Sequence, residues 1–234
     1  MLKLFITATD TDAGKTYVAQ ALVSALVAKS KKVAIYKPIS AGCERVNGAL
    51  INEDAKLLQI QANCQQTIEQ VNPIAFEPAI APHIAAAKEQ REITLTSIEQ
   101  GYEEVVNLGA DVIICEGAGG WRLPLGNGKF LSEFVQVTKQ RVILVVNMKL
   151  GCLNHAVLTY QSIISDGLLC VGWIANCQED MPYLTENMAE LTALLPIPKL
   201  AELDFESDIT KAAQKIDLSL LPTLLKIQFF KSLR

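Results

Sequence analysis

Short apolar runs rich in β-branched residues recur along the chain, with helix-like stretches between them. The runs cover residues 4–7, 33–36, 112–115, 142–146 and 169–175. Continuous apolar character, rather than strict alternation, is typical of strands that are buried on both faces. Strands separated by helices indicate right-handed crossovers around a parallel sheet. The sequence therefore predicts an α/β fold with three layers, a parallel sheet flanked by helices.

Three of the intervening segments predict helices, because they show apolar residues at helical spacing or a residue typical of a helix start. These segments are residues 15–29, 94–107 and 155–165. The proline-rich stretch 72–82 carries apolar residues between its prolines, which favours a structured loop over a hinge. The chain shows no internal repeat and no Ser/Gly linker, so we expect residues 1–234 to form one domain.

Charge and cysteine usage exclude several classes of protein. Lysine and arginine number 21 against 25 acidic residues, and the net charge of −4 is the opposite of what nucleic-acid binding needs. Six cysteines include no CxxC pair, and with two histidines they cannot form a zinc site of usual spacing. We therefore expect reduced thiols and a cytoplasmic protein. The sequence contains neither a signal-peptide pattern nor an apolar run long enough to span a membrane, so no membrane association is expected.

The first predicted strand runs into the segment ATDTDAGKT, where a helix begins. Backbone N–H groups and the helix dipole make such a loop an anion site, in which Lys15 would reach the β- and γ-phosphates and Thr16 would ligate Mg²⁺. The strict pattern GxxxxGK[ST] has glycine where this chain has Thr9, and the longer-loop variant has glycine where this chain has Ala8. A plain strand-to-helix turn is the alternative. The GKT triplet after a first strand favours a P-loop NTPase-like phosphate site.

The second and third predicted strands also end in charged residues. Lys37 follows the second run and would face the same crevice as Lys15, where a second cation could neutralise charge during phosphoryl transfer. Glu116 follows the third run and precedes a glycine-rich turn, a placement that suits a Mg²⁺ ligand. Asp54 could ligate the same ion. Taken alone, Lys37 fits a solvent-facing strand end equally well, and Asp54 fits the start of a helix better.

Other polar residues carry weaker signals. The glycine-containing loop at residues 149–156 opens a helix and could hold a carboxylate. A dyad of Cys152 with His155 is possible from the spacing, but a structural histidine is favoured. The amide of Asn176 could read a purine edge. Cys115 as a nucleophile is disfavoured, because it belongs to a buried run with no histidine nearby in the sequence.

Taken together, seven segments in this order between residue 5 and about residue 200 resemble the dethiobiotin synthetases. They are TDTDAGKT, YKPISAG, NEDA, VNP followed by APHIAA, CEGAGGW, KLGCLNHAVLT and GWIANC. The resemblance implies a homodimer of a P-loop relative that uses ATP and Mg²⁺ to join CO₂ to 7,8-diaminononanoate, which closes the ureido ring of dethiobiotin in biotin synthesis. It also implies that the diamine forms a carbamate, that the carbamate attacks the γ-phosphate, and that the second amine displaces phosphate from the mixed anhydride.

The same resemblance implies roles for individual residues. Lys15 and Lys37 would be catalytic, and Mg²⁺ would be ligated by Thr16, Asp54 and Glu116. The residues that would bind ATP are Thr11, Asp12, Ala13, Gly14, Lys15, Thr16, Asp54, Glu116, Gly117, Ala118, Gly119, Asn176 and Cys177. Those that would bind the diamine are Lys37, Ser40 and Ala41, together with Gly151, Cys152, Leu153 and Asn154 from the partner subunit.

The sequence departs from the family pattern in three places. Ala8 stands where the family has glycine, which adds a methyl group near the nucleotide. Ala41 stands where the family has serine, so the substrate would lack a hydroxyl partner there unless Ser40 supplies one. After Leu200 the segment AELDFE differs from the usual GEIP-like pattern near the adenine, which leaves the base specificity less constrained than the chemistry.

Two rival functions share this fold class. Membrane-cycling partition ATPases carry a lysine where this chain has Asp10, and the apolar, basic tail at residues 220–234 could lie on an anionic bilayer. A packed terminal helix or a subunit contact is the favoured interpretation of that tail. Amidotransferase-like synthetases need a further glutamine-hydrolysing domain, which the chain after Leu200 is too short to hold.

Overall fold

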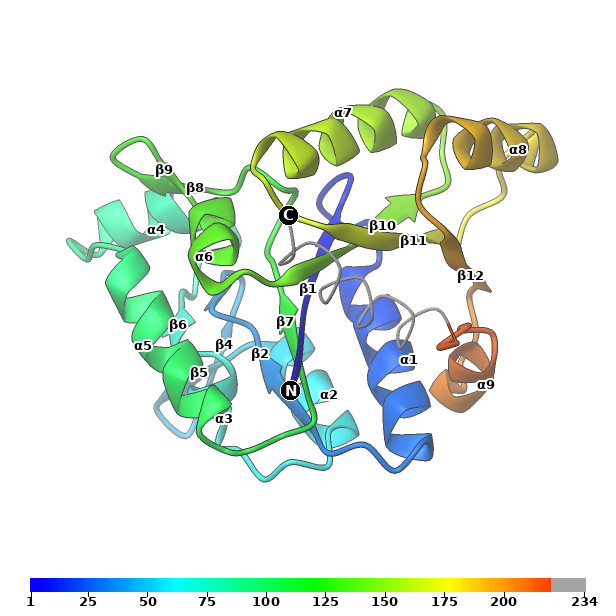
Figure 1. Cartoon of the computed structure of the whole chain (residues 1–234). Coiled ribbons are helices and arrows are strands. Elements are labelled where there is room, and N and C mark those ends of the chain that lie inside the picture. Colours follow the sequence, from blue (N-terminus) through cyan, green and yellow to red (C-terminus); the bar gives the residue numbers. More distant parts are fainter. Residues whose placement is uncertain (220–234) are drawn as a thin grey trace, which may run out of the picture.

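A six-stranded parallel sheet forms the centre of the computed structural model, which describes residues 1–219 (Figure 1). The strands lie in the order β12-β11-β10-β1-β7-β2, and each neighbouring pair is parallel. They are β1 (Leu2–Ala8), β2 (Val33–Tyr36), β7 (Val112–Glu116), β10 (Arg141–Asn147), β11 (Cys170–Cys177) and β12 (Lys199–Asp204). This confirms the predicted fold class and all five predicted strands.

The sixth strand was not predicted, and its sequence explains why. β12 reads KLAELD and lies at one edge of the sheet, so several of its side chains are exposed and no continuous apolar run marks it. Short strand pairs accompany the central sheet. They are β3 (Ile39–Ser40) with β6 (Ile74–Ala75), β4 (Glu44–Val46) with β5 (Ala49–Ile51), and β8 (Pro124–Gly126) with β9 (Lys129–Phe130). The stretch 72–82 is thus structured, as predicted, since it contains β6.

Helices cover both faces of the sheet. They are α1 (Lys15–Ala28), α2 (Glu53–Gln61), α3 (Ile68–Val71), α4 (Pro82–Lys88), α5 (Leu95–Val106), α6 (Leu131–Thr138), α7 (Cys152–Ser165), α8 (Leu184–Leu194) and α9 (Ile209–Gln214). Helix α5 begins after Thr94, whose side chain accepts a hydrogen bond from the backbone N–H of Ser97. The predicted start of α7 at His155 was wrong. That helix begins at Cys152, because Gly151 adopts a left-handed φ of 95° and ends the preceding loop.

Two hydrophobic cores lie on opposite faces of the sheet, because alternate strand residues point to opposite sides. Leu4 and Ile6 of β1 belong to the core beneath α1, α2 and α9, whereas Phe5 belongs to the core beneath α5, α6, α7 and α8. Figure 1 shows α1 and α9 side by side on one face. This arrangement confirms the three predicted layers.

All six cysteines are free and buried, in agreement with the predicted reduced thiols. No helix within residues 1–219 is long and apolar enough to cross a membrane. The tail at residues 220–234, for which a terminal helix or a bilayer contact was considered, lies outside the described residues.

The packing of α6 against the sheet generates a prediction about stability. Phe134 is fully buried and its ring contacts those of Tyr36 and Tyr102. Phe134→Ala should lower the free energy of unfolding by about 3–5 kcal/mol, because it removes apolar packing and leaves a cavity. Urea denaturation measures this. Val137→Ala on the same helix, where the side chain is 61% exposed, should change it by less than about 0.5 kcal/mol. Equal losses in the two variants would contradict the packing described.

Candidate active site

A cavity of about 830 Å³ opens where β1, β2 and β7 reach their carboxyl ends. Parallel strands deliver the loops that follow them to the same edge, so residues far apart in the sequence line one space. The predicted residues that line it are Thr11, Asp12, Gly14, Lys15, Thr16, Lys37, Ser40, Ala41, Asp54, Glu116, Gly117, Ala118 and Gly119.

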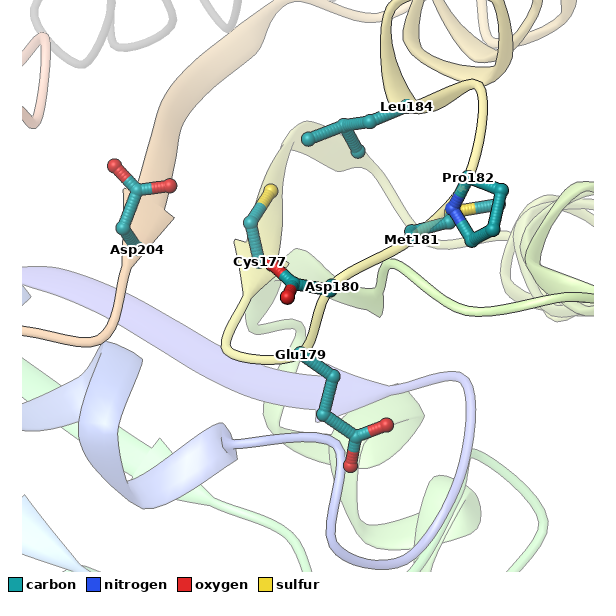
Figure 2. Close-up of a pocket in the computed structure, with 7 residues that line it drawn as sticks. All are labelled: Cys177, Glu179, Asp180, Met181, Pro182, Leu184 and Asp204. Atoms are coloured by element: carbon teal, nitrogen blue, oxygen red, sulfur yellow. The ribbon is translucent and has the colours of Figure 1, made fainter.

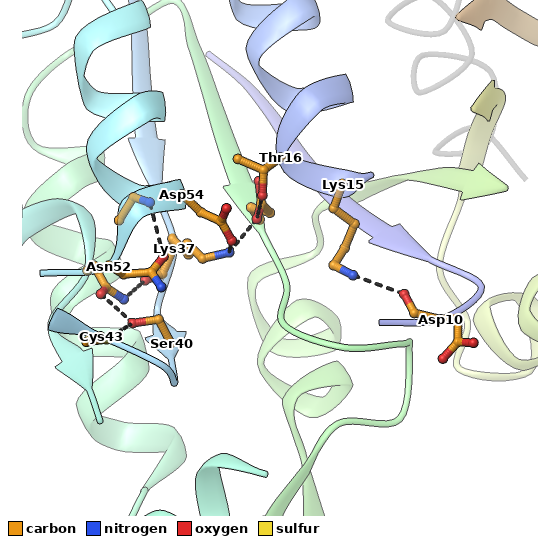
Figure 3. A network of polar contacts seen from close by, with 11 residues as sticks. Asp10, Lys15, Thr16, Lys37, Ser40, Cys43, Asn52 and Asp54 are labelled. Atoms are coloured by element: carbon orange, nitrogen blue, oxygen red, sulfur yellow. Dashed lines mark hydrogen bonds and ion pairs between the residues drawn. The ribbon is translucent and has the colours of Figure 1, made fainter. Parts of the chain in front are cut away.

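A buried carboxylate lies at the centre of the polar contacts in this cavity. Glu116 has no exposed surface, and its Oε1 accepts hydrogen bonds from Thr16 Oγ1, at 2.9 Å, and from Lys37 Nζ (Figure 3). The same Lys37 ammonium lies 3.4 Å from Asp54 Oδ2. Glu116 Oε2 is also buried and has no hydrogen-bond partner within residues 1–219. A buried anionic oxygen without a partner is costly, so its position favours a cation in the cavity.

The two lysines of the cavity lie in opposite electrostatic surroundings. Burial lowers the pKa of Lys37, but the charges and hydrogen bonds of Glu116 and Asp54 outweigh burial and raise it above its ordinary value. Burial lowers the pKa of Lys15, and the more distant Glu116 compensates only in part. Lys15 Nζ donates to the backbone oxygen of Asp10 at 3.1 Å, and Figure 3 shows it turned away from Lys37. Of these two lysines, only Lys37 is therefore paired with a carboxylate of the described residues.

Asn176 makes a hydrogen bond to the loop that precedes α1. The Asn176 side chain is buried, and its Nδ2 donates to the backbone oxygen of Ala13 at 3.0 Å. Gly14 adopts a left-handed φ of 81°, and a Cβ at this position would lie 2.1 Å from Asn176 Nδ2. Ala13 is buried as well.

The departure at Ala8 adds a methyl group to the core beneath α1 rather than to the cavity.

Ser40 and Ala41 line the cavity, but the Ser40 hydroxyl is already engaged within the protein. Its Oγ donates to Asn72 Oδ1 at 2.6 Å and lies 3.1 Å from Cys43 Sγ. Ala41 presents only a methyl group. The family pattern has a serine at position 41. Because the Ser40 hydroxyl is already engaged, Ser40 does not replace the hydroxyl of that serine.

A second hollow of about 470 Å³ lies beyond the carboxyl ends of β11 and β12 (Figure 2). Its lining residues are Cys177, Glu179, Asp180, Met181, Pro182, Leu184 and Asp204. Burial raises the pKa of the Cys177 thiol to about 11, so the thiol is neutral at pH 7. Sequence reasoning found Cys177 but missed the acidic residues here, because they follow no recognisable motif.

The segment Gly151 to Asn154 lines neither of these two cavities. It forms the first turn of α7, next to Lys149, whose ammonium lies 3.4 Å from Asp10 Oδ2. Cys152 is buried with a raised pKa caused by burial, whereas His155 is exposed. A buried thiol with a raised pKa beside an exposed imidazole disfavours a Cys–His dyad. Cys115 is buried, and burial raises the pKa of its thiol well above the ordinary value, so it is no nucleophile either.

Sequence reasoning missed two parts of the cavity wall. Asn52 lines the cavity and caps α2, since its side chain accepts from the backbone N–H of Ala55 at 3.2 Å. This cap places Asp54 in the first turn of α2, and an Asn directly before an acidic helix start is the signal that could have found it. An apolar wall is formed by Ala79, Ile80, Ala81, Pro82 and Leu123.

Comparisons with known proteins agree with the geometry. A family model described as an AAA domain matches residues 2–213. A protein of Aeromonas salmonicida (strain A449) named ATP-dependent dethiobiotin synthetase BioD is 46% identical over 221 residues, which cover 94% of this chain and 98% of that protein. A protein of the same name from Pseudoalteromonas translucida (strain TAC 125) is 48% identical over 205 residues, covering 86% of this chain and 89% of that one.

Solved structures show the same fold at low sequence identity. The MinC:MinD cell division protein complex of Aquifex aeolicus matches with a TM-score of 0.57 at 16% identity, covering 96% of each chain. The MinD cell division protein of the same organism gives a TM-score of 0.52 at 16% identity, covering 92% of this chain and 87% of that one. These matches support the fold alone.

The packing of Asn176 against the phosphate loop predicts the effect of a substitution at Gly14. Gly14→Ala combines a left-handed φ with a clash against Asn176, so the loop must move. Affinity for a fluorescent ATP analogue should fall about 5- to 30-fold, since a strain of about 1–2 kcal/mol corresponds to that range.

Gly48 offers a matched control for this measurement. Its φ of 87° is also left-handed, but a Cβ there would meet nothing within 4 Å. Gly48→Ala should therefore destabilise the protein without altering nucleotide affinity. Unchanged affinity in Gly14→Ala would show that this loop does not bind the nucleotide.

Proposed function

The chain belongs to the ATP-dependent dethiobiotin synthetase family, and we propose that it closes the ureido ring of dethiobiotin from 7,8-diaminononanoate, CO₂ and ATP. It is an ATP-dependent ligase of biotin synthesis. The observation that carries the proposed reaction is the buried Glu116 carboxylate, shared by Thr16 and Lys37 beside the GKT loop. A phosphate loop, a catalytic cation and metal-ligating oxygens are the groups that phosphoryl transfer requires.

Mg²⁺ is proposed to bind at Thr16, Asp54 and Glu116. These residues offer the hard oxygen ligands that Mg²⁺ prefers, and Glu116 Oε2 is the buried acceptor without a partner. Among residues 1–219, no group of three His, Cys, Asp or Glu side chains could hold a metal ion alone. The ion would therefore share its coordination with ATP phosphate oxygens. When bound, it would neutralise charge on the phosphates.

The proposed reaction has three steps. One amine of the diamine adds to the carbon of CO₂ to give a carbamate, with loss of a proton. A carbamate oxygen then attacks the γ-phosphorus of ATP, so that ADP leaves. Finally the second amine attacks the carbamate carbon and phosphate leaves, which closes the ring. The protein contributes positioning and charge rather than a covalent intermediate.

Lysines 15 and 37 supply the positive charge for these steps. Lys15 would exchange the Asp10 backbone oxygen for the β- and γ-phosphates, while the backbone of residues 11–14 and the Thr16 hydroxyl surround them. Lys37 would stabilise the carbamate and the transferring phosphoryl group. Gly117, Ala118 and Gly119 line the same cavity and leave room for both substrates.

The base of ATP is proposed to lie between Asn176 and the second hollow. Asn176 Oδ1 is buried and has no partner in the described part of the chain, so it can accept a hydrogen bond from an exocyclic amino group. Cys177 follows it directly and lines that hollow. An adenine amino group fits this acceptor.

A homodimer is proposed because the first turn of α7 lies away from the cavity of its own chain. Gly151, Cys152, Leu153 and Asn154 would bind the diamine carboxylate in the partner's site. Leu150 beside this turn is 96% exposed, and Leu158 on α7 is also exposed. Exposed apolar side chains at one helix are typical of a surface that another subunit covers. A membrane-cycling ATPase is not favoured, because Asp10 replaces the lysine that those proteins need.

Phosphate release tests the proposed reaction directly. ADP should form only when the diamine, bicarbonate, Mg²⁺ and ATP are all present, because the phosphoryl acceptor is the carbamate. Reactions that omit one component at a time provide the controls, and mass spectrometry identifies the product. Phosphate release at the full rate without the diamine would indicate a plain ATPase instead.

The Lys37–Glu116 contact predicts opposite effects of Lys37→Met on two measurements. Turnover should fall at least about 10²-fold, because a preorganised charge at the transferring phosphoryl group is lost. In the absence of nucleotide, the affinity for Mn²⁺, measured by electron paramagnetic resonance, should rise at least about tenfold. The substitution removes the ammonium that competes with the metal ion for Glu116 and Asp54. The repulsion between that ammonium and the metal ion, even when screened, is large enough to change the affinity about tenfold.

A matched variant separates charge from packing in that experiment. Lys56 is an exposed lysine on α2, so Lys56→Met should leave both turnover and Mn²⁺ affinity unchanged. Wild-type turnover in Lys37→Met would remove this residue from the mechanism. A fall in Mn²⁺ affinity would show that the lysine and the metal do not compete.

A further inference from the structure

Strand β2, which Lys37 directly follows, lies at the edge of the central sheet. It pairs with β7 on one side, and on the other side no strand of the central sheet covers it. An edge strand leaves a row of backbone N–H and C=O groups that need other partners. The segment that follows α2 supplies them.

Three side-chain amides from this segment bind the free edge of β2 in succession. Asn63 Oδ1 accepts from Val33 N at 2.8 Å, and Asn63 Nδ2 donates to the backbone oxygen of Lys31. Gln66 binds both the N–H and the C=O of Ile35, each at 2.8 Å. Asn72 Nδ2 donates to the backbone oxygen of Lys37 at 2.7 Å. Together with the backbone N–H of Cys64, which donates to Val33 O at 3.2 Å, these amides take the place of a neighbouring strand.

Asn72 differs from the other two amides in burial and in its second bond. It is 7% exposed, whereas Asn63 is exposed and Gln66 is partly exposed. Its Oδ1 accepts from Ser40 Oγ at 2.6 Å, so one side chain joins Lys37 to Ser40. Both of those residues line the cavity. The adjoining backbone bond from Lys37 N to Val71 O, at 2.7 Å, fixes the same point of the chain.

We infer that Asn72 is a positioning residue for Lys37, which holds the backbone from which the Lys37 ammonium reaches Glu116 and the phosphoryl group. The inference rests on the proposed catalytic role of Lys37. Asn72 does not itself line the cavity, so it acts through Lys37. A buried amide with both ends engaged confines its partners more closely than an exposed one.

Removing Asn72 frees the Lys37 backbone at the point where the catalytic side chain begins. In Asn72→Ala, kcat should fall about 10- to 100-fold, because a displacement of about 1 Å at a reacting group costs up to that factor. KM for ATP should stay within about twofold, because no hydrogen bond joins Asn72 to the loop at residues 10–16 in the described structure. Nucleotide-free Mn²⁺ affinity should rise part of the way toward that of Lys37→Met, because the competing ammonium is held less firmly.

Asn63→Ala is the matched control, because it removes two bonds from the other end of the same strand. Its melting temperature should fall, while kcat and Mn²⁺ affinity stay at the wild-type values. All assays are run at a temperature well below every melting transition. Should Asn72→Ala fail to fold, Asn72→Asp keeps the side-chain shape but loses the amide donor to Lys37, and the same fall in kcat is expected.

The outcomes separate this inference from the proposed function. If Lys37→Met loses turnover but Asn72→Ala keeps the kcat and the Mn²⁺ affinity of Asn63→Ala, the positioning role is overturned and the proposed function stands. If Lys37→Met keeps turnover, the catalytic role of Lys37 falls and the inference falls with it. A selective loss of kcat in Asn72→Ala, with the shift in Mn²⁺ affinity, supports the inference.

Discussion

The buried ion pair between Lys37 and Glu116 is the interaction on which the geometry of the site depends. Each charge would be costly inside the protein alone, and each supplies the partner that the other requires. The pair joins β7 to the edge strand β2, so it forms only if these two strands are parallel neighbours. Thr16 joins the same carboxylate, which ties the start of α1 to the pair. The fold thus brings the side chains of Thr16 and Lys37, from two separate segments, to one oxygen of Glu116.

This dependence also explains the opposite states of the two lysines. Lys37 has its charge compensated by carboxylates, whereas Lys15 has only a backbone oxygen within hydrogen-bond reach among the described residues. Burial lowers the pKa of Lys15, so an anion placed beside it would gain more than one placed beside a paired lysine. In the proposed mechanism this local positive charge would favour a polyphosphate even though the whole chain carries a net charge of −4.

Much of the fold was predictable because strands buried on both faces carry continuous apolar runs. β12 escaped prediction because an edge strand needs no such run, and the start of α7 was misplaced because it depends on the left-handed backbone of Gly151. Motif residues were predictable by type and order. Their contacts were not. Nothing in the sequence indicates that Lys15 turns to Asp10, or that Asn176 holds Ala13, since both depend on packing between distant segments.

The amides along β2 show how a stability device can serve the site. Side-chain amides and the backbone of Cys64 and Val71 together satisfy the free edge of β2. They end at Asn72, which leaves the carboxyl end of β2 open. The edge is therefore protected without closing the space in which Lys37 meets Glu116. Asn72 thus satisfies a backbone group at this edge and, in the proposed mechanism, also places the lysine that acts on the phosphoryl group.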